Sequence, residues 1–207
     1  MKVGPEAQWA NLLCHFIAEH QINKERVFVS IPREKVVVRF LRLPVATKEN
    51  LRKVIEYEAP KYTPFDKEEA YFDYQILRED KEWLQLIVVF VKKEALDPYL
   101  SALKKIGISP QSIQVPSVAA LNLFFYHAED KGRDTVLLDV GEPFFEMNLI
   151  QGGEWRESLH LPLPPEKKVE KIIDILARSG LTEDSLPRAN FFLHGLASER
   201  TLPALQK

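Results

Sequence analysis

Two apolar runs, Val27–Pro32 (VFVSIP) and Val36–Pro44 (VVVRFLRLP), open the part of the sequence that decides the fold. β-Branched and aromatic residues dominate both runs, which predicts two strands joined as a hairpin. A helical pattern follows over Thr47–Ala59, with Thr47 as its expected N-cap. This helix should end before Pro60, because the residue before a proline is biased away from the helical conformation.

A second predicted hairpin joins Ala70–Leu77 to Trp83–Lys92, and a helix over Glu94–Ile106 follows it and ends at Gly107. The run Trp83–Lys92 is the most hydrophobic of the strands, so we expect it to be central and to bury Val89 in the core. Residues 27–115 are therefore interpreted as one β-β-α-β-β-α module with a sheet face covered by two helices. Nothing in this order resembles a catalytic constellation, and the module is interpreted as a docking unit.

Before the module, Pro5–Glu19 has helical spacing of its apolar residues and needs a sheet to cover. Its stripe consists of Trp9, Leu12, Leu13, Phe16 and Ile17. The single cysteine, Cys14, lies in this stretch, and we interpret it as a buried structural thiol rather than a nucleophile.

The sequence changes character after the polar segment Asp130–Asp134, which is the best candidate for a domain boundary. Beyond it we predict a three-strand meander, with a tight turn at Gly152–Gly153. A helix over Glu166–Ser179 and a strand over Asn190–His194 complete this part. The predicted domains are an N-terminal helix (1–26), the inserted docking module (27–115) and a second subdomain (116–207). The predicted strands of the meander are Thr135–Val140, Phe144–Ile150 and Glu154–Leu161.

Composition excludes several classes of function. The net charge of −2 and the isoelectric point near 6.2 argue against a general nucleic-acid binder. One cysteine excludes a disulfide framework, and the five histidines show no metal-ligand spacing, so no metal site is predicted. No apolar run approaches the ~20 residues that span a bilayer, and no signal peptide is recognisable, so a cytoplasmic location is expected.

The order of several short motifs resembles the actin-like family of pilus-assembly and secretion proteins. This family includes PilM of type IV pili and the cytoplasmic domain of GspL of type II secretion. The resemblance implies a partial actin-like (ribonuclease H-like) fold of the α/β (α+β) class, with the module of residues 27–115 inserted in it. The motifs are Phe28–Pro32, Leu43–Pro44, Val54–Pro60, Phe72–Leu77, Tyr99–Leu103, Ile106–Pro110, Val115–Leu121 and Leu137–Gly141.

The resemblance also implies a nucleotide cleft, and the sequence suggests that this cleft is degenerate. By itself Asp139-Val140-Gly141 is explained better as an ordinary turn, whereas the family resemblance favours descent from a phosphate-binding turn. Glu142 then adds negative charge and Pro143 removes an N–H donor. The other phosphate turn of the family is absent, and only Gly195 remains of a glycine pair. We therefore expect Asp139, Gly141 and Gly195 to form an inactive cofactor site, with no cofactor and with ATP and magnesium disfavoured.

The sequence-based hypothesis is a non-catalytic cytoplasmic scaffold of a type IV pilus or type II secretion inner-membrane platform. The resemblance implies two partners: the short cytoplasmic tail of a membrane-anchored assembly protein and the motor ATPase. A homodimer is left open, as is the question of whether the chain is part of a longer protein. Tyr57, Tyr62 and Phe65 are the expected partner-binding residues, because aromatic residues gather around the proline-containing loop 60–65; ordinary packing is the rival explanation. The alternative functions are an active actin-like ATPase and a cell-division protein of the same fold.

Overall fold

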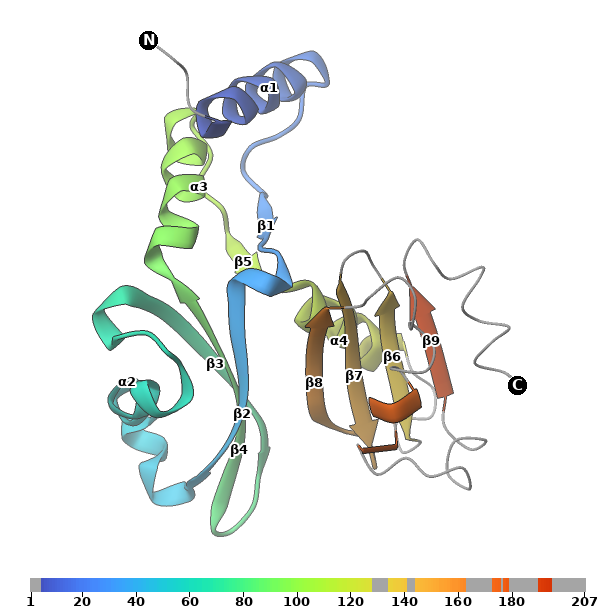
Figure 1. Ribbon diagram of the computed structural model, residues 1–207. Helices are drawn as coiled ribbons and strands as arrows, with labels where there is room; N and C mark the ends of the chain where they lie inside the picture. The colour runs from blue at the N-terminus through green and yellow to red at the C-terminus, as the bar shows by residue number, and fades with distance from the viewer. Residues whose placement is uncertain are drawn as a thin grey trace. The chain divides into compact units, whose positions relative to one another are not determined.

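A three-stranded antiparallel sheet lies at the centre of the first half of the chain, in the order β2-β4-β3. The strands are β2 (Val36–Pro44), β3 (Ala70–Glu79) and β4 (Trp83–Lys92). The computed structural model describes residues 5–127, 134–140, 144–162, 173–175, 177–178 and 190–194 (Figure 1). β4 is the middle strand, which confirms the expectation drawn from its hydrophobicity.

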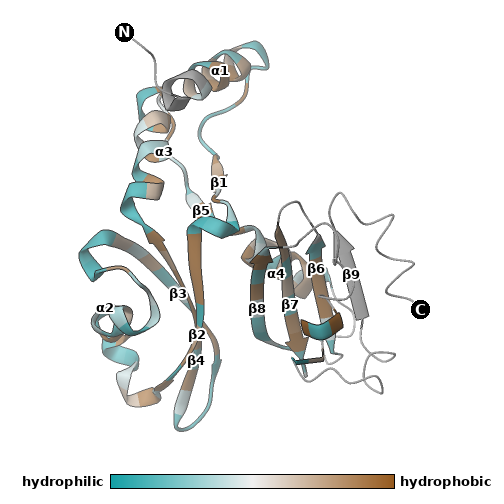
Figure 2. Cartoon of the chain, viewed as in Figure 1, coloured by the Kyte–Doolittle hydropathy of each residue, from teal (hydrophilic) through white to brown (hydrophobic). Residues whose placement is uncertain are grey.

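The chain divides into two compact units, residues 1–119 and 120–207. The three-part domain division expected from the sequence stays a prediction. Figure 2 shows that strands β2 and β4 of the first unit and β7 of the second are predominantly hydrophobic.

Helix α2 (Leu51–Tyr62) covers one face of the three-stranded sheet. Its buried side chains are Leu51, Ile55 and Ala59, which lie three or four positions apart and so share one helical face. From β4, alternate residues meet this helix, as the twofold period of a strand requires. The fully enclosed members from β4 are Leu84, Leu86, Val88 and Phe90.

The expectation that Val89 lies in this core is wrong. Val89 is only half-buried, and it faces the opposite side of the sheet from Val88 and Phe90. Because successive side chains of a strand alternate between its faces, an error of one residue reverses the assignment. The hydrophobic run alone could not decide this, since most of the residues of β4 are apolar.

The predicted hairpin between the first two apolar runs is also wrong. Strand β1 (Phe28–Ser30) pairs in parallel with β5 (Ser112–Gln114), which is more than 80 residues away in sequence. Pro32 and the 3₁₀ turn η1 (Arg33–Lys35) redirect the chain between β1 and β2. Pro32 also lacks a main-chain donor for a ladder, so a continuous hairpin is not formed.

Helix α1 (Pro5–Glu19) packs against α3 (Lys93–Lys105) and β1. Ile17 forms a buried cluster with Leu103 and Ile108, and Trp9 and Leu13 pack against it. Leu12 and Phe16 from the predicted stripe are exposed. Cys14 is free and exposed, so its interpretation as a buried thiol is wrong. It lies on the side of α1 that the cluster does not cover.

Gly107 ends α3 as the sequence predicts. Its φ of 77° is left-handed, which favours glycine because it has no Cβ. The N–H of Ile108 donates to Leu103 O at 2.9 Å, and the N–H of Gly107 donates to Lys104 O at 3.1 Å. These two bonds form a Schellman cap, and Ile108 and Leu103 share one hydrophobic cluster.

The bounds of α2 differ from the prediction at both ends. A 3₁₀ segment, η2 (Val45–Asn50), precedes the helix, and the Thr47 hydroxyl donates to Pro44 O at 2.7 Å instead of capping α2. At the other end the helix continues through Pro60 to Tyr62. Pro60 removes one donor near the C-terminus, but its φ is compatible with a helix. The N–H of Thr63 donates to Ala59 O at 3.1 Å and closes the last turn.

The second unit contains a four-stranded sheet in the order β8-β7-β6-β9. The meander of β6 (Thr135–Val140), β7 (Phe144–Gln151) and β8 (Glu154–Pro162) is confirmed, and β9 (Asn190–His194) lies parallel to β6. Gly152 and Gly153 have φ values of 57° and 77°, which is the signature of a two-residue type I′ turn. Helix α4 (Pro116–His127) precedes this sheet in the chain. Within the helix predicted over 166–179, residues 173–175 and 177–178 are helical and the others lie outside the described residues.

Candidate partner-binding site

The loop that follows α2 is held in place by Thr63, whose side chain is buried. Its hydroxyl oxygen lies 3.3 Å from the carbonyl oxygens of Ala59 and Phe65 and accepts a hydrogen bond from Phe65 N–H at 3.3 Å. A threonine hydroxyl that bonds main-chain groups two residues on is a common way to fix a turn. Phe65 therefore follows a turn that is fixed by its own local hydrogen bonds.

Arg39 ties this loop to the sheet. Its Nε donates to Tyr62 O at 3.0 Å, and its Nη1 donates to Val38 O at 3.0 Å. Charge-assisted bonds of this kind are stronger than neutral ones. Arg39 interrupts an otherwise apolar strand, and this interruption was the only sequence signal of its role.

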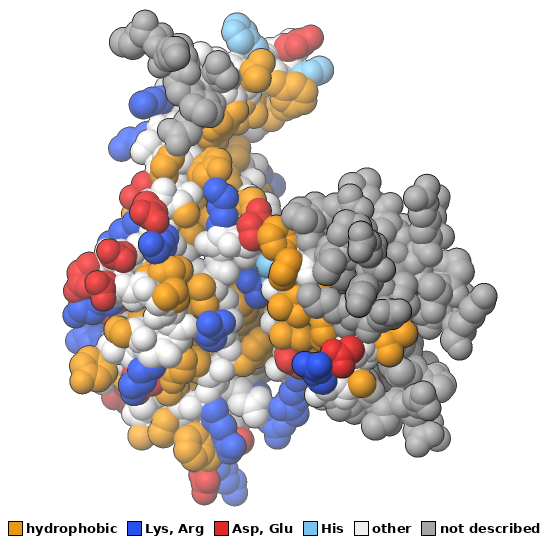
Figure 3. All heavy atoms as spheres, in the orientation of Figure 1, with side chains coloured by type: hydrophobic (Ala, Val, Ile, Leu, Met, Phe, Trp, Pro, Cys, Tyr) orange, Lys and Arg blue, Asp and Glu red, His pale blue; other side chains and the backbone are white. Residues whose placement is uncertain are grey.

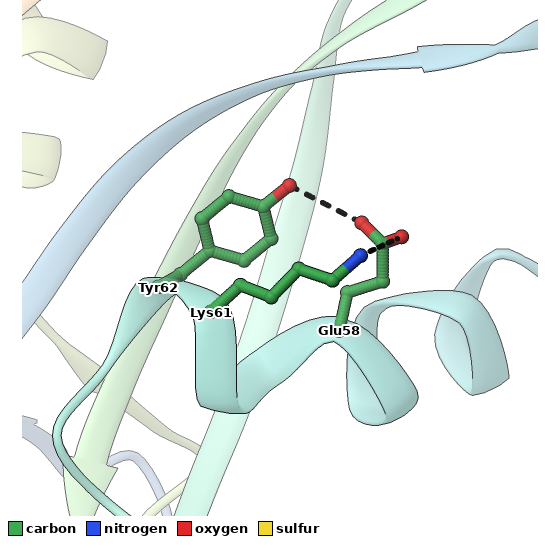
Figure 4. A network of polar contacts seen from close by, with 3 residues as sticks. All are labelled: Glu58, Lys61 and Tyr62. Atoms are coloured by element: carbon green, nitrogen blue, oxygen red, sulfur yellow. Dashed lines mark hydrogen bonds and ion pairs between the residues drawn. The ribbon is translucent and has the colours of Figure 1, made fainter.

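The last turn of α2 carries a polar network of three side chains, shown in Figure 4. Lys61 Nζ lies 2.9 Å from one carboxylate oxygen of Glu58, and the Tyr62 hydroxyl donates to the other at 3.2 Å. The bond from Lys61 lowers the pKa of the Glu58 carboxyl and raises the pKa of the Lys61 ammonium group. Burial, followed by the bond to Glu58, raises the pKa of the Tyr62 hydroxyl.

The network predicts a small pH dependence of stability. The folded-state pKa of Glu58 is lowered from its usual value of 4.5, so its contribution is present above about that pH and is lost as the pH falls through the folded pKa. Glu58→Gln should cost about 0.5 kcal/mol at pH 7, a small effect because solvent screens the pair. Urea unfolding at pH 7 and pH 3 measures this, and the cost should be smaller at pH 3. Glu56→Gln, at an exposed neighbour, is the control, and an equal cost at both pH values would contradict the assignment.

The three expected partner-binding residues occupy different environments. Tyr57 is 81% exposed on α2, one helical turn before Lys61. Tyr62 is half-buried and packs against the core under α2. Phe65 is half-buried, and Lys92 Nζ lies 5.4 Å from the centre of its ring. Tyr62 thus has an evident packing role, whereas Tyr57 and Phe65 keep surface for a partner.

Two aromatic residues of β3, Tyr71 and Tyr74, have structural partners. The Tyr71 hydroxyl donates to Asp97 Oδ1 at 3.0 Å, and this bond raises the pKa of Tyr71. Tyr74 is half-buried against the core. Lys92 and Thr63 are site residues that sequence reasoning missed, because their roles depend on loop contacts that carry no motif.

The predicted nucleotide cleft is described only in part. Asp139 is exposed near the end of β6, opposite Glu146 of β7 in the ladder. Gly141 and Gly195 lie outside the described residues. Glu146 is buried, and its Oε1 accepts hydrogen bonds from Asn148 and Ser158, both at 3.4 Å. Across the described ranges, no group of three or more histidine, cysteine or acidic side chains could hold a metal ion.

Comparison with solved structures defines the class of protein: the fold is actin-like. A chain of the PilM–PilN type IV pilus biogenesis complex matches with a TM-score of 0.68 at 24% identity, over 87% of this chain and 54% of that chain. An actin-like ATPase-fold protein of unknown function from Bacteroides thetaiotaomicron matches with a TM-score of 0.60 at 12% identity, over 99% and 75% of the two chains. The chain thus spans about half the length of the PilM–PilN chain that it matches.

The cytoplasmic domain of EpsL, an inner-membrane component of the type II secretion system of Vibrio cholerae, also shares the fold. It has a TM-score of 0.53 at 13% identity, over 88% of this chain and 66% of that chain. A family model then gives the more specific result, because the model described as type IV pilus assembly protein PilM matches residues 5–156. The chain belongs to this family. A comparison with curated proteins found no match.

No helix in the described part of the chain is both long and apolar enough to cross a membrane.

Proposed function

We propose that this chain is a non-catalytic scaffold of a type IV pilus or type II secretion inner-membrane platform. The observation that carries the proposal is the PilM family match over residues 5–156, which contains the whole three-stranded sheet, α2 and the loop after it. A chain of this fold was solved as part of a PilM–PilN complex. We therefore propose that the membrane partner is a PilN-type protein and that it holds this chain at the inner membrane.

The loop after α2 suits a docking role for a physical reason. Thr63 and Arg39 fix its main chain, so little ordering entropy opposes binding there. Tyr57 and Phe65 provide aromatic area that a partner can cover, and Lys92 beside Phe65 can add a charge contact. The motor ATPase is the second proposed partner of the platform.

The proposal predicts the effect of two substitutions. Phe65→Ala and Tyr57→Ala should each weaken binding of the cytoplasmic tail of a PilN-type protein by ~1–3 kcal/mol, as expected for aromatic anchors. Calorimetric titration with a synthetic peptide of the cytoplasmic tail of a PilN-type protein measures the loss. Tyr126→Ala is a matched control, because Tyr126 is an equally exposed helical tyrosine at 82%. Unchanged affinity in both variants would move the site away from this loop.

The non-catalytic part of the proposal is tested separately. The sequence places Glu142 and Pro143 directly after Asp139-Val140-Gly141, which adds charge repulsion and removes a donor where a phosphate would bind. Titration with Mg-ATP to millimolar concentration should give no binding heat, and Asp139→Ala should leave tail affinity unchanged. Saturable binding of ATP that Asp139→Ala abolishes would favour the alternative, a working actin-like ATPase.

A further inference from the structure

Two hydrogen bonds show which main-chain groups lie on the outer sides of the β2-β4-β3 sheet. The N–H of Val45 donates to Glu82 O at 2.9 Å, and the N–H of Asp80 donates to Trp83 O at 3.0 Å. In an antiparallel ladder, the main-chain N–H and C=O groups of consecutive residues point alternately toward and away from the neighbouring strand. With the observed register, the main-chain N–H and C=O groups of the even-numbered residues of β2 point away from β4. The main-chain groups of Phe72, Tyr74 and Ile76 in β3 also point away from β4.

The outer side of β2 is protected against pairing with another strand. Arg33 Nη1 donates to Val36 O at 3.1 Å, and Arg39 Nη1 donates to Val38 O at 3.0 Å. The Thr47 hydroxyl donates a hydrogen bond to Pro44 O at 2.7 Å, and Pro44 has no main-chain N–H. Proteins commonly blunt the edge of a sheet with such positively charged residues and prolines.

The outer side of β3 over residues 71–77, called here the β3 edge, has such protection from the described residues only at Phe72, where the Arg52 guanidinium carbon lies 4.7 Å from the ring centroid. Its one hydrogen bond from a described residue is a long one of 3.5 Å, from Arg52 Nη2 to Phe72 O. The N–H of Phe72 and both main-chain groups of Tyr74 and Ile76 have no partner within the described part of the chain. The segment contains neither lysine nor proline, and the β-bulge comes only after Ile76.

The hydrophobic core is also incomplete along this strand. The side chains of Phe72, Tyr74 and Ile76 point toward α2, but each is only half-buried. On the opposite outer strand, Leu41 and Leu43 are 6% and 7% exposed. A further strand beside β3 would cover the open side of the same core and would satisfy the outward main-chain groups.

The charge near the β3 edge indicates which kind of strand fits. Residues 66–73 (DKEEAYFD) contain four acidic side chains and one lysine, and Figure 3 shows acidic side chains gathered where β3 begins. Asp66 and Glu69 form no ion pair within the described ranges, and Asp73 has only the weak, exposed contact of 3.7 Å with Arg52. An incoming segment with Lys or Arg would be attracted to this side and one with acidic residues repelled.

We propose that the β3 edge receives an extended, basic segment of the membrane partner's cytoplasmic tail as a fourth strand. The inference rests on the proposed function and names the way in which the tail is bound. Cytoplasmic segments next to membrane spans carry an excess of Lys and Arg, which matches the acidic side of β3. Edge addition supplies affinity through main-chain bonds and selectivity through alternate side chains. Asp66 and the 3₁₀ turn η3 (Lys67–Glu69) connect the loop that ends at Phe65 to β3, so the two surfaces are neighbours in the sequence.

Amide hydrogen exchange by NMR on the wild-type protein with the synthetic tail peptide tests the inference. The amides of Phe72, Tyr74 and Ile76 should exchange at least tenfold more slowly in the complex. The amides of Asp73 and Gln75 already point toward β4 and are the internal control. A peptide with its Lys and Arg replaced by Gln should bind at least tenfold more weakly.

A matched pair of variants gives an independent readout. Tyr74→Pro and Tyr74→Ala both remove the ring, but only proline removes the outward N–H, so the proline variant should bind at least fivefold more weakly. If the tail binds but Phe72, Tyr74 and Ile76 keep their exchange rates, the edge inference is overturned and the proposed function stands. If the neutral peptide binds with the same affinity as the basic peptide, the charge argument is overturned. A tail that does not bind the wild-type protein overturns both.

Discussion

Val88→Asp is expected to unfold the first unit. Val88 is 0% exposed in the central strand β4 and faces helix α2, among Leu41, Leu86 and Phe90. An unpaired carboxylate there loses its hydration without gaining a partner and costs roughly 3–5 kcal/mol. The total stability of a domain is only about 5–15 kcal/mol, so the loss of cooperative unfolding should be visible in a urea titration followed by circular dichroism.

Two further substitutions make this result specific for the face of the strand. Val89→Asp should cost clearly less, because Val89 is half-buried on the opposite face. Gln75→Asp, at an exposed position of β3, should change the unfolding midpoint little. If Val89→Asp proved more damaging than Val88→Asp, the assignment of β4 side chains to the two faces would be wrong.

The second large effect is expected from Ile55→Ala. Ile55 is 0% exposed at the centre of the helix–sheet contact, so its truncation leaves a cavity that its neighbours can fill only in part. Such substitutions cost about 2–5 kcal/mol. Equilibrium unfolding measures the cost, with Glu56→Ala as the control at the next, exposed position of the same helix. A loss below about 0.5 kcal/mol, within the usual range for surface changes, would show that α2 does not depend on this contact.

These two results bear on function because α2 and the sheet together hold the proposed binding surface. Tyr57 and Tyr62 come from the helix, Arg39 comes from β2, and the β3 edge belongs to the same sheet. Stability and tail binding should therefore be measured separately for every variant. A variant that loses affinity but keeps its unfolding midpoint reports on the surface rather than on the core.

The sequence by itself determined the elements whose signals are local. Short apolar runs and β-branched residues predicted β2, β3, β4 and the meander β6–β8, and their existence is confirmed. Gly107 and the pair Gly152–Gly153 predicted a helix end and a tight turn, because both conformations need positive φ. The family was recognisable because the order of its short motifs survives in the chain.

Tertiary structure decided what depends on distant neighbours. The partner of β1 is β5 rather than β2, and no local pattern specifies a parallel pairing across more than 80 residues. The core face of β4 was ambiguous because both of its faces are apolar, and the exposure of Cys14 depends on how α1 lies against α3. The difference between the protected β2 edge and the open β3 edge also arises only in the folded chain. Arg33, Arg39 and Thr47 reach carbonyl groups whose outward direction is set by the ladder with β4.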